Sequence, residues 1–301
     1  MKFRIVLVAL AWITALVAGI HPSEAGPITF NSALPVAKGE FILRGQAILN
    51  RSTGDPGATN RDLRVLIFPT VLAYGATRNL ALFGIVSYLD KTLDFTTPSG
   101  RVRRGDSGLG DSTFLARYTV FSVDRLGDTR RLAPFVGLKV PTGDDNERDS
   151  LGRLPQPLQL GSGSWDPIVG TSFTWQTFDW EFDSAVQYRF NTKANKFEFG
   201  DQARFDMSFQ YRLWPRTLES GVPAFFYGVL ESNLIYAGKN EVGGINNPNS
   251  GGTTWILAPG LQYVTRRIVL EAIVQIPVIQ DLNGIALEND YSVRGGFRFN
   301  F

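Results

Sequence analysis

The last eleven residues of the chain alternate between apolar and polar side chains. Successive side chains of a β-strand point to opposite faces, so this pattern predicts a strand with one apolar and one polar face. An aromatic face that runs to the final residue is typical of the closing strand of a transmembrane barrel, which meets lipid outside and a polar lumen inside. The alternative is an edge strand of a secreted β-sandwich. The apolar face holds Tyr291, Val293, Phe297, Phe299 and Phe301.

The same alternation recurs along the chain and predicts an all-β fold, a transmembrane antiparallel up-and-down β-barrel of about twelve strands. Long polar loops, such as 90–109 and 142–164, take turns with shorter links, such as 122–131. The strand expected at 79–89 is apolar on both faces, which predicts that it packs against an inward-folded segment such as 28–36. The expected strands are residues 40–49, 62–74, 79–89, 110–121, 132–141, 165–176, 179–190, 201–213, 222–236, 253–264, 268–279 and 290–301.

The amino terminus has the composition of a secretory signal peptide. Lys2 and Arg4 precede an uncharged apolar run, and small residues then allow cleavage before Gly26. The alternative is an uncleaved anchor, for which the apolar run is short. We therefore expect a cleaved signal peptide at 1–25, an N-terminal periplasmic or lumen-inserted segment at 26–39, and the barrel at 40–301.

Cysteine and histidine usage narrows the chemistry. The chain has no cysteine, which excludes disulfides, thiolate metal sites and covalent haem attachment. Its one histidine, His21, lies in the predicted leader, so the mature chain lacks the usual general base near neutral pH. Glu181 and Asp183 could in principle do acid–base work, but beside arginines on one strand face they are expected to form ion pairs. We therefore predict that the protein is not an enzyme and has no cofactor.

Two other motifs have structural interpretations. The glycine spacing of 105–110 is followed by a strand rather than a helix, which argues against a dinucleotide-binding loop. The acidic run 144–149 could hold calcium, but such runs are more often solvated loops, and we predict no metal site. The formal net charge is only +2, without the one-sided basic surface of a nucleic-acid binder, so no nucleic-acid partner is expected.

Charged residues on the polar strand faces are expected to point into the lumen. Eight acidic and eight basic residues occupy such positions, a balance that argues against a filter of a single charge sign. They would either line a narrow path for solutes or fill a closed barrel with ion pairs. The predicted lumen-lining residues are Arg44, Arg117, Lys139, Glu181, Asp183, Arg189, Arg204, Asp206, Arg212, Glu231, Glu271, Arg294 and Arg298, and Glu40, Asp111 and Asp166 complete the set.

Three glycine-rich stretches carry a family resemblance, namely Gly108–Asp111 leading into Phe114–Tyr118, Pro134–Asp144, and Leu160–Pro167 running into Gly170. Together with the hairpin around Tyr74 and Gly75 and the closing strand, they resemble the outer-membrane transporter family named after the MetA pathway of phenol degradation, and the likeness covers most of the mature chain. The resemblance implies an outer-membrane channel for passive uptake or efflux of small solutes, hydrophobic or aromatic compounds among them, and brings no catalytic residue. The alternative is a non-conducting scaffold barrel that sheathes a periplasmic partner.

The remaining expectations concern biogenesis and location. A terminal aromatic residue on a closing strand, here Phe301, resembles the assembly signal read by the bacterial barrel-assembly machinery. An even strand count predicts that both termini lie in the periplasm of a Gram-negative bacterium, with the barrel in its outer membrane. The expected partners are outer-membrane lipid, the assembly machinery during biogenesis and a small-molecule solute.

Overall fold

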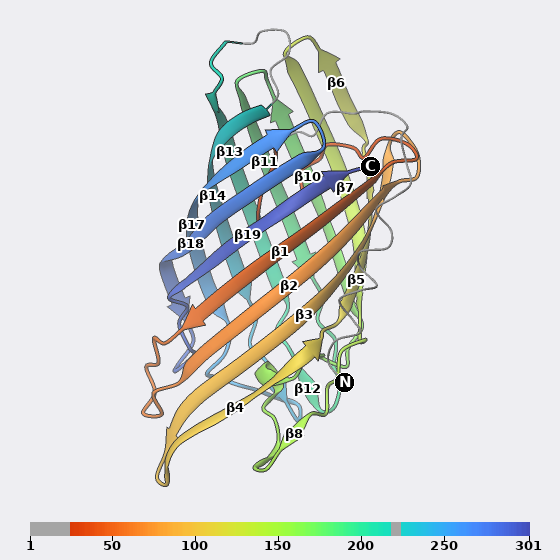
Figure 1. Ribbon diagram of the computed structural model, residues 1–301. Coiled ribbons are helices and arrows are strands. Elements are labelled where there is room, and N and C mark those ends of the chain that lie inside the picture. Colours follow the sequence, from red (N-terminus) through yellow and green to blue (C-terminus); the bar gives the residue numbers. More distant parts are fainter. Residues whose placement is uncertain (1–24, 218–223) are drawn as a thin grey trace, which may run out of the picture.

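The alternating segments pair edge to edge into a closed antiparallel ring (Figure 1). The computed structural model describes residues 25–217 and 224–301, so the predicted leader up to residue 24 and His21 lie outside the described residues. Three consecutive segments, β4, β5 and β6, together form one interrupted strand between β3 and β7. Counted in this way, the barrel has twelve strands, as predicted. The wall consists of β1 (Phe41–Ser52), β2 (Asp62–Gly75), β3 (Leu80–Thr97), β4 (Gly100–Leu109), β5 (Ser112–Tyr118), β6 (Phe121–Arg125), β7 (Asp128–Val140), β10 (Asp166–Gln176), β11 (Trp180–Arg189), β13 (Gln202–Trp214), β14 (Ala224–Ala237), β17 (Gly252–Thr265), β18 (Ile268–Leu282) and β19 (Tyr291–Asn300).

The closing strand meets the first strand, as its aromatic face predicts. β19 pairs with β1 from Ile42 opposite Asn300 onward. The backbones of Phe41 and Phe301 also exchange two hydrogen bonds of 2.8 and 2.9 Å, and their rings stack with centroids 5.7 Å apart. The ring therefore has no open edge at this seam, which a barrel in lipid requires because unpaired backbone groups are costly there.

The two ends of the barrel differ. We call the end where β1 begins and β19 ends the turn end, because tight turns join most strand pairs there. The opposite, long-loop end carries the extended β3–β4 hairpin and several short elements (Figure 1, lower part). Those elements are β8 (Arg148–Asp149), β9 (Gly152–Arg153), the 3₁₀ turn η1 (Gln156–Leu158), β12 (Phe197–Glu198), β15 (Glu241–Val242) and β16 (Ile245–Asn246).

Two expected connections are in fact strands. Most of the expected loop 90–109 is a hairpin, in which Thr97 pairs with Gly100 and Tyr88 with Leu109. The expected link 122–131 is another hairpin, because β6 runs to Arg125 and β7 begins at Asp128. Polar residues outnumber apolar ones in both segments, so the regular alternation that marks the other strands is weak in them.

Burial follows the alternation within each strand. In β18, Glu271 and Gln275 are buried, whereas Leu270 and Ile276 are about half exposed on the outer surface. Polar side chains therefore face the lumen, and an apolar belt covers the outside, as in barrels that face lipid. Among residues 25–217 and 224–301, no helix is long and apolar enough to cross a membrane.

Candidate permeation lumen

The first described residues occupy the interior of the barrel. We call residues 25–37 the N-terminal segment. Its Ala25, Ile28 and Ala33 are almost completely buried among inward-facing wall residues. A chain inside a barrel must satisfy its backbone N–H and C=O groups by hydrogen bonding to the wall, because water reaches few of them. Wall side chains supply these partners along the segment.

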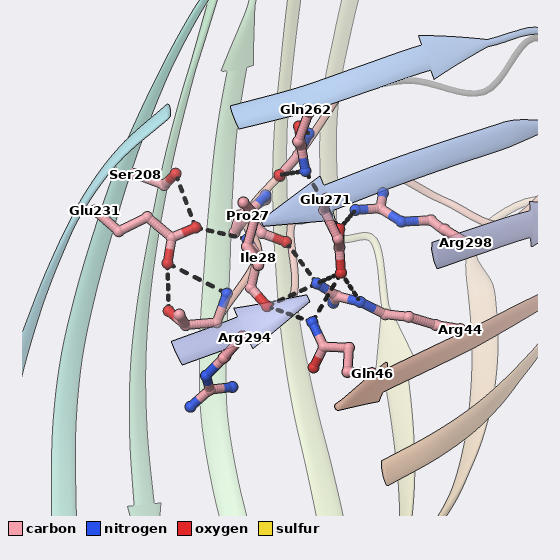
Figure 2. A network of polar contacts seen from close by, with 12 residues as sticks. Pro27, Ile28, Arg44, Gln46, Ser208, Glu231, Gln262, Glu271, Arg294 and Arg298 are labelled. Carbon is pink, nitrogen blue, oxygen red and sulfur yellow. Dashed lines mark hydrogen bonds and ion pairs between the residues drawn. The ribbon is translucent and has the colours of Figure 1, made fainter. Parts of the chain in front are cut away.

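Glu231, on β14, holds the start of the N-terminal segment (Figure 2). Its carboxylate accepts hydrogen bonds from the amide N–H of Ile28 at 2.5 Å and of Thr29 at 3.2 Å, and also from the Thr29 hydroxyl. The Ser208 hydroxyl, on β13, lies 3.4 Å from the same carboxylate. Hydrogen bonds to a charged acceptor are roughly twice as strong as neutral ones, so Glu231 fixes this turn of the segment firmly against the wall.

A second network lies across the segment from Glu231 (Figure 2). Glu271 receives Arg44 at 2.7 Å and Gln46 at 2.7 Å, and Arg298 lies 3.5 Å away. Arg44 and Gln46 also donate to the carbonyl oxygen of Ile28, at 2.7 and 3.0 Å. The segment therefore connects two clusters of buried polar groups, one on β13 and β14 and the other on β18, β19 and β1.

The later part of the N-terminal segment contacts β5 and β10. The Arg117 guanidinium donates to the carbonyl oxygens of Ser32 and Leu34. The Ala33 amide donates to the Thr174 hydroxyl at 2.8 Å. These bonds carry the segment across the barrel toward β1.

An apolar cluster follows where the segment leaves the lumen. Val36 packs there with Ala73 of β2 and with Ala81 and Phe83 of β3. The sequence predicts this packing, because the strand expected at 79–89, which corresponds to the first part of β3, is apolar on both faces.

Near the long-loop end, Lys139 organises a third cluster. Its ammonium lies 2.5 Å from Asp166 and 3.1 Å from Asp111. Asp111 in turn accepts hydrogen bonds from the amides of Gly143 and Ser162, at 3.1 and 2.9 Å. The connection between β7 and β10 is thereby tied back to the barrel wall.

The same connection is held at its far end by Arg104 of β4, which forms a two-point ion pair with Asp149, at 2.7 and 2.8 Å. These hydrogen bonds lower the pKa of the Asp149 carboxyl. In the neighbouring loop between β1 and β2, the Arg61 guanidinium beside Asp55 holds the pKa of that carboxyl well below its usual range. Both carboxylates therefore stay ionised to low pH, and their loops keep these ion pairs.

The acidic run 144–149 is partly accounted for by these contacts. Asp149 pairs with Arg104, and Asp145 accepts the Asn195 side-chain amide at 2.7 Å. Within the described part of the chain, no group of three or more metal-ligating side chains is assembled.

The other charged residues that were predicted to point inward form separate contacts along the wall. Buried Asp183 accepts from Gln210 at 3.2 Å, and buried Glu181 accepts from Gln176 at 2.8 Å. Arg204 pairs with Asp206 at 3.0 Å. Three further arginines occupy different places: Arg212 reaches Asp179 at the turn end, Arg294 donates to Gln275 at 2.8 Å, and Arg189 lies beside Arg204 and Asp166.

The sequence did not reveal the uncharged partners of these groups. Gln46, Thr174, Gln262 and Asn233 all hold the N-terminal segment, and Gln262 exchanges two hydrogen bonds with the backbone of Gly26. Their only sequence signal is an inward position on a strand, which they share with many other polar residues. Between the segment and the wall, a cavity of about 410 Å³ remains at the turn end.

Comparisons with known proteins agree with this architecture. The chain is similar over 92% of its length to all of a solved outer membrane channel from Pseudomonas putida F1, with a TM-score of 0.65 at 15% identity, which establishes the shared fold. It also has a weaker likeness to the CymD monoaromatic hydrocarbon channel, covering 88% of this chain and 89% of that one, with a TM-score of 0.38 at 11% identity. Among curated proteins, none matches the chain. The model of the family described as "Putative MetA-pathway of phenol degradation" matches residues 61–272, and the protein belongs to this family of outer-membrane β-barrels.

Proposed function

We propose that the protein is an outer-membrane channel for the passive uptake or efflux of small solutes, hydrophobic or aromatic compounds among them. The proposal places both termini, and so the turn end, on the periplasmic side, and the long-loop end outside. Outer-membrane lipid surrounds the belt of exposed apolar residues, and the assembly machinery acts on the closing strand during biogenesis. The predicted lumen-lining residues, from Arg44 to Arg298, would set the field along the path.

One observation carries the proposal. The interior carries many buried charged and polar side chains and retains a cavity of about 410 Å³, instead of being filled throughout by packed apolar side chains. Small barrels whose interior serves only stability can fill it with packed side chains. A lumen that retains space beside charged groups is suited to a solute that brings its own polar contacts. The membership in a family of outer-membrane barrels supports the same proposal.

A second function is favoured by the N-terminal segment. Its hydrogen bonds to Glu231, Arg117 and Thr174 hold it across the lumen between β14, β5 and β10. A non-conducting scaffold barrel around a periplasmic partner could keep the segment there permanently. In a channel, the segment must shift, or solutes must pass beside it through the cavity. The two functions therefore differ in one property, which is flux through the purified barrel.

The test is solute flux into liposomes that contain the purified protein. We expect swelling with arabinose and with sodium benzoate, compared with protein-free liposomes. Val71→Trp adds bulk to the cavity wall and should slow the flux, whereas Val278→Trp on the exposed outer surface should leave it unchanged. No swelling with the wild-type barrel would favour the scaffold, and equal flux through both variants would mean that solutes avoid this cavity.

A further inference from the structure

The cavity at the turn end is lined by two chemically different groups of side chains. The apolar group combines Phe30, Leu34 and Val36 of the N-terminal segment with Val71 and Phe83 of the wall. These side chains come from two separate parts of the chain, and they form a surface that would accept an aromatic or aliphatic body. The cavity volume of about 410 Å³ lies within the range of small-molecule sites.

The polar part of the lining is rich in arginine. Arg44, Arg117, Arg131 and Arg298 line the cavity, and Glu40 is the one carboxylate among the residues lining it. Two acids behind this lining offset part of the charge. Glu271 contacts Arg44 and Arg298, and Asp124 pairs with Arg131 at 2.7 Å.

Several donors of these arginines are not used by carboxylates. Arg117 places its guanidinium 4.9 Å from the centre of the Phe83 ring and donates to backbone carbonyl oxygens. The Nε groups of Arg131 and Arg298 are buried and have no hydrogen-bond partner within the described residues. A buried donor without a partner is costly, and an arginine N–H is satisfied best by a carboxylate, which its planar fork can hold at two points.

We propose that this cavity is a binding site for small organic carboxylates, with the carboxylate on Arg131 and Arg298 and the apolar body against Phe30, Val71 and Phe83. This site rests on the proposed channel function and specifies its substrate class, because a solute that crosses the barrel must pass the turn end. It selects for solutes that combine a negative charge with an apolar body.

Calorimetric titration of the purified, folded barrel with benzoate tests the site. Losing one charge-assisted hydrogen bond corresponds to about tenfold weaker binding, so Arg298→Gln and Arg131→Gln should each weaken benzoate binding by about that factor. Arg267→Gln, in the exposed turn between β17 and β18, is the matched control and should bind like the wild type. Benzyl alcohol lacks the charge and acetate lacks the ring, so both should bind the wild type more weakly than benzoate.

Benzoate binding that is equal in all three variants, or absent from the wild type, would overturn the site. Should the arginine variants fail to fold, the wild-type order of benzoate over benzyl alcohol and acetate still decides, because equal or reversed affinities contradict the proposal. A measurement of ion conductance distinguishes failure of this binding site from failure of the proposed channel function. A barrel that conducts but does not bind benzoate keeps the channel and loses the site, and one that binds without conducting does the reverse.

Discussion

Replacing Glu231 with leucine should release the N-terminal segment. The change removes the acceptor for the amides of Ile28 and Thr29 and for the Thr29 hydroxyl. An unsatisfied buried donor costs about 1–3 kcal/mol, and the Ile28 amide is the most deeply buried of the three. Removing a buried carboxylate also removes its desolvation cost, so we expect a net effect of about 2 kcal/mol.

This loss should raise the population with an undocked segment roughly 30-fold, at about 1.4 kcal/mol per factor of ten. Hydrogen–deuterium exchange of the peptide 26–37, followed by mass spectrometry, measures that opening directly. Glu231→Gln keeps one acceptor oxygen and should show a smaller increase. Glu241→Leu is the control, because Glu241 pairs with Lys193 at the long-loop end, away from the segment. Unchanged exchange of the peptide in Glu231→Leu, or equal acceleration in all barrel strands, would refute this local anchoring.

Three further predictions concern processing, assembly and register. The intact mass of protein isolated from outer membranes should correspond to a chain that begins at Gly26, and a mass that retains the leader would contradict the proposed location. Phe301→Ser keeps the backbone bonds of the seam but removes the terminal ring, so it should lower the yield of assembled barrel in cells far more than the thermal stability of purified protein; normal yield would count against an assembly signal. Phe209 is 45% exposed on the outer face, so Phe209→Arg should lower the free energy of unfolding in lipid by roughly 2–4 kcal/mol, with Phe209→Leu as the control. An arginine variant as stable as the leucine variant would mean that this residue does not face lipid.

The alternation of side chains predicted the barrel because lipid imposes it. Where one strand face meets hydrocarbon and the other meets the lumen, apolar and polar residues alternate along the sequence, as in β18 and β19. The β3–β4 hairpin breaks this rule. Arg101 and Arg103 point outward there, so the strand lacks an apolar outer face and the sequence predicts a loop.

The contents of the lumen were less predictable. Inward positions could be assigned from alternation alone, and Glu231 and Glu271 are buried as those positions require. Which groups meet depends on barrel closure, which brings Arg44 of β1 to Glu271 of β18 across more than two hundred residues. The path of the N-terminal segment depends on the same closure, because its partners come from β1, β5, β10, β14 and β17.

Ion flow through single barrels in planar bilayers tests the central claim, that solutes pass through this lumen. The wild-type protein should conduct, and its reversal potential in a salt gradient should move toward cation preference when Arg204 and Arg298 are both replaced with glutamine. The reason is that charges in an enclosed lumen act at a dielectric below that of water and are weakly screened. A conducting barrel without this shift would mean that these arginines do not line the path. A folded wild-type barrel that never conducts would contradict the channel itself.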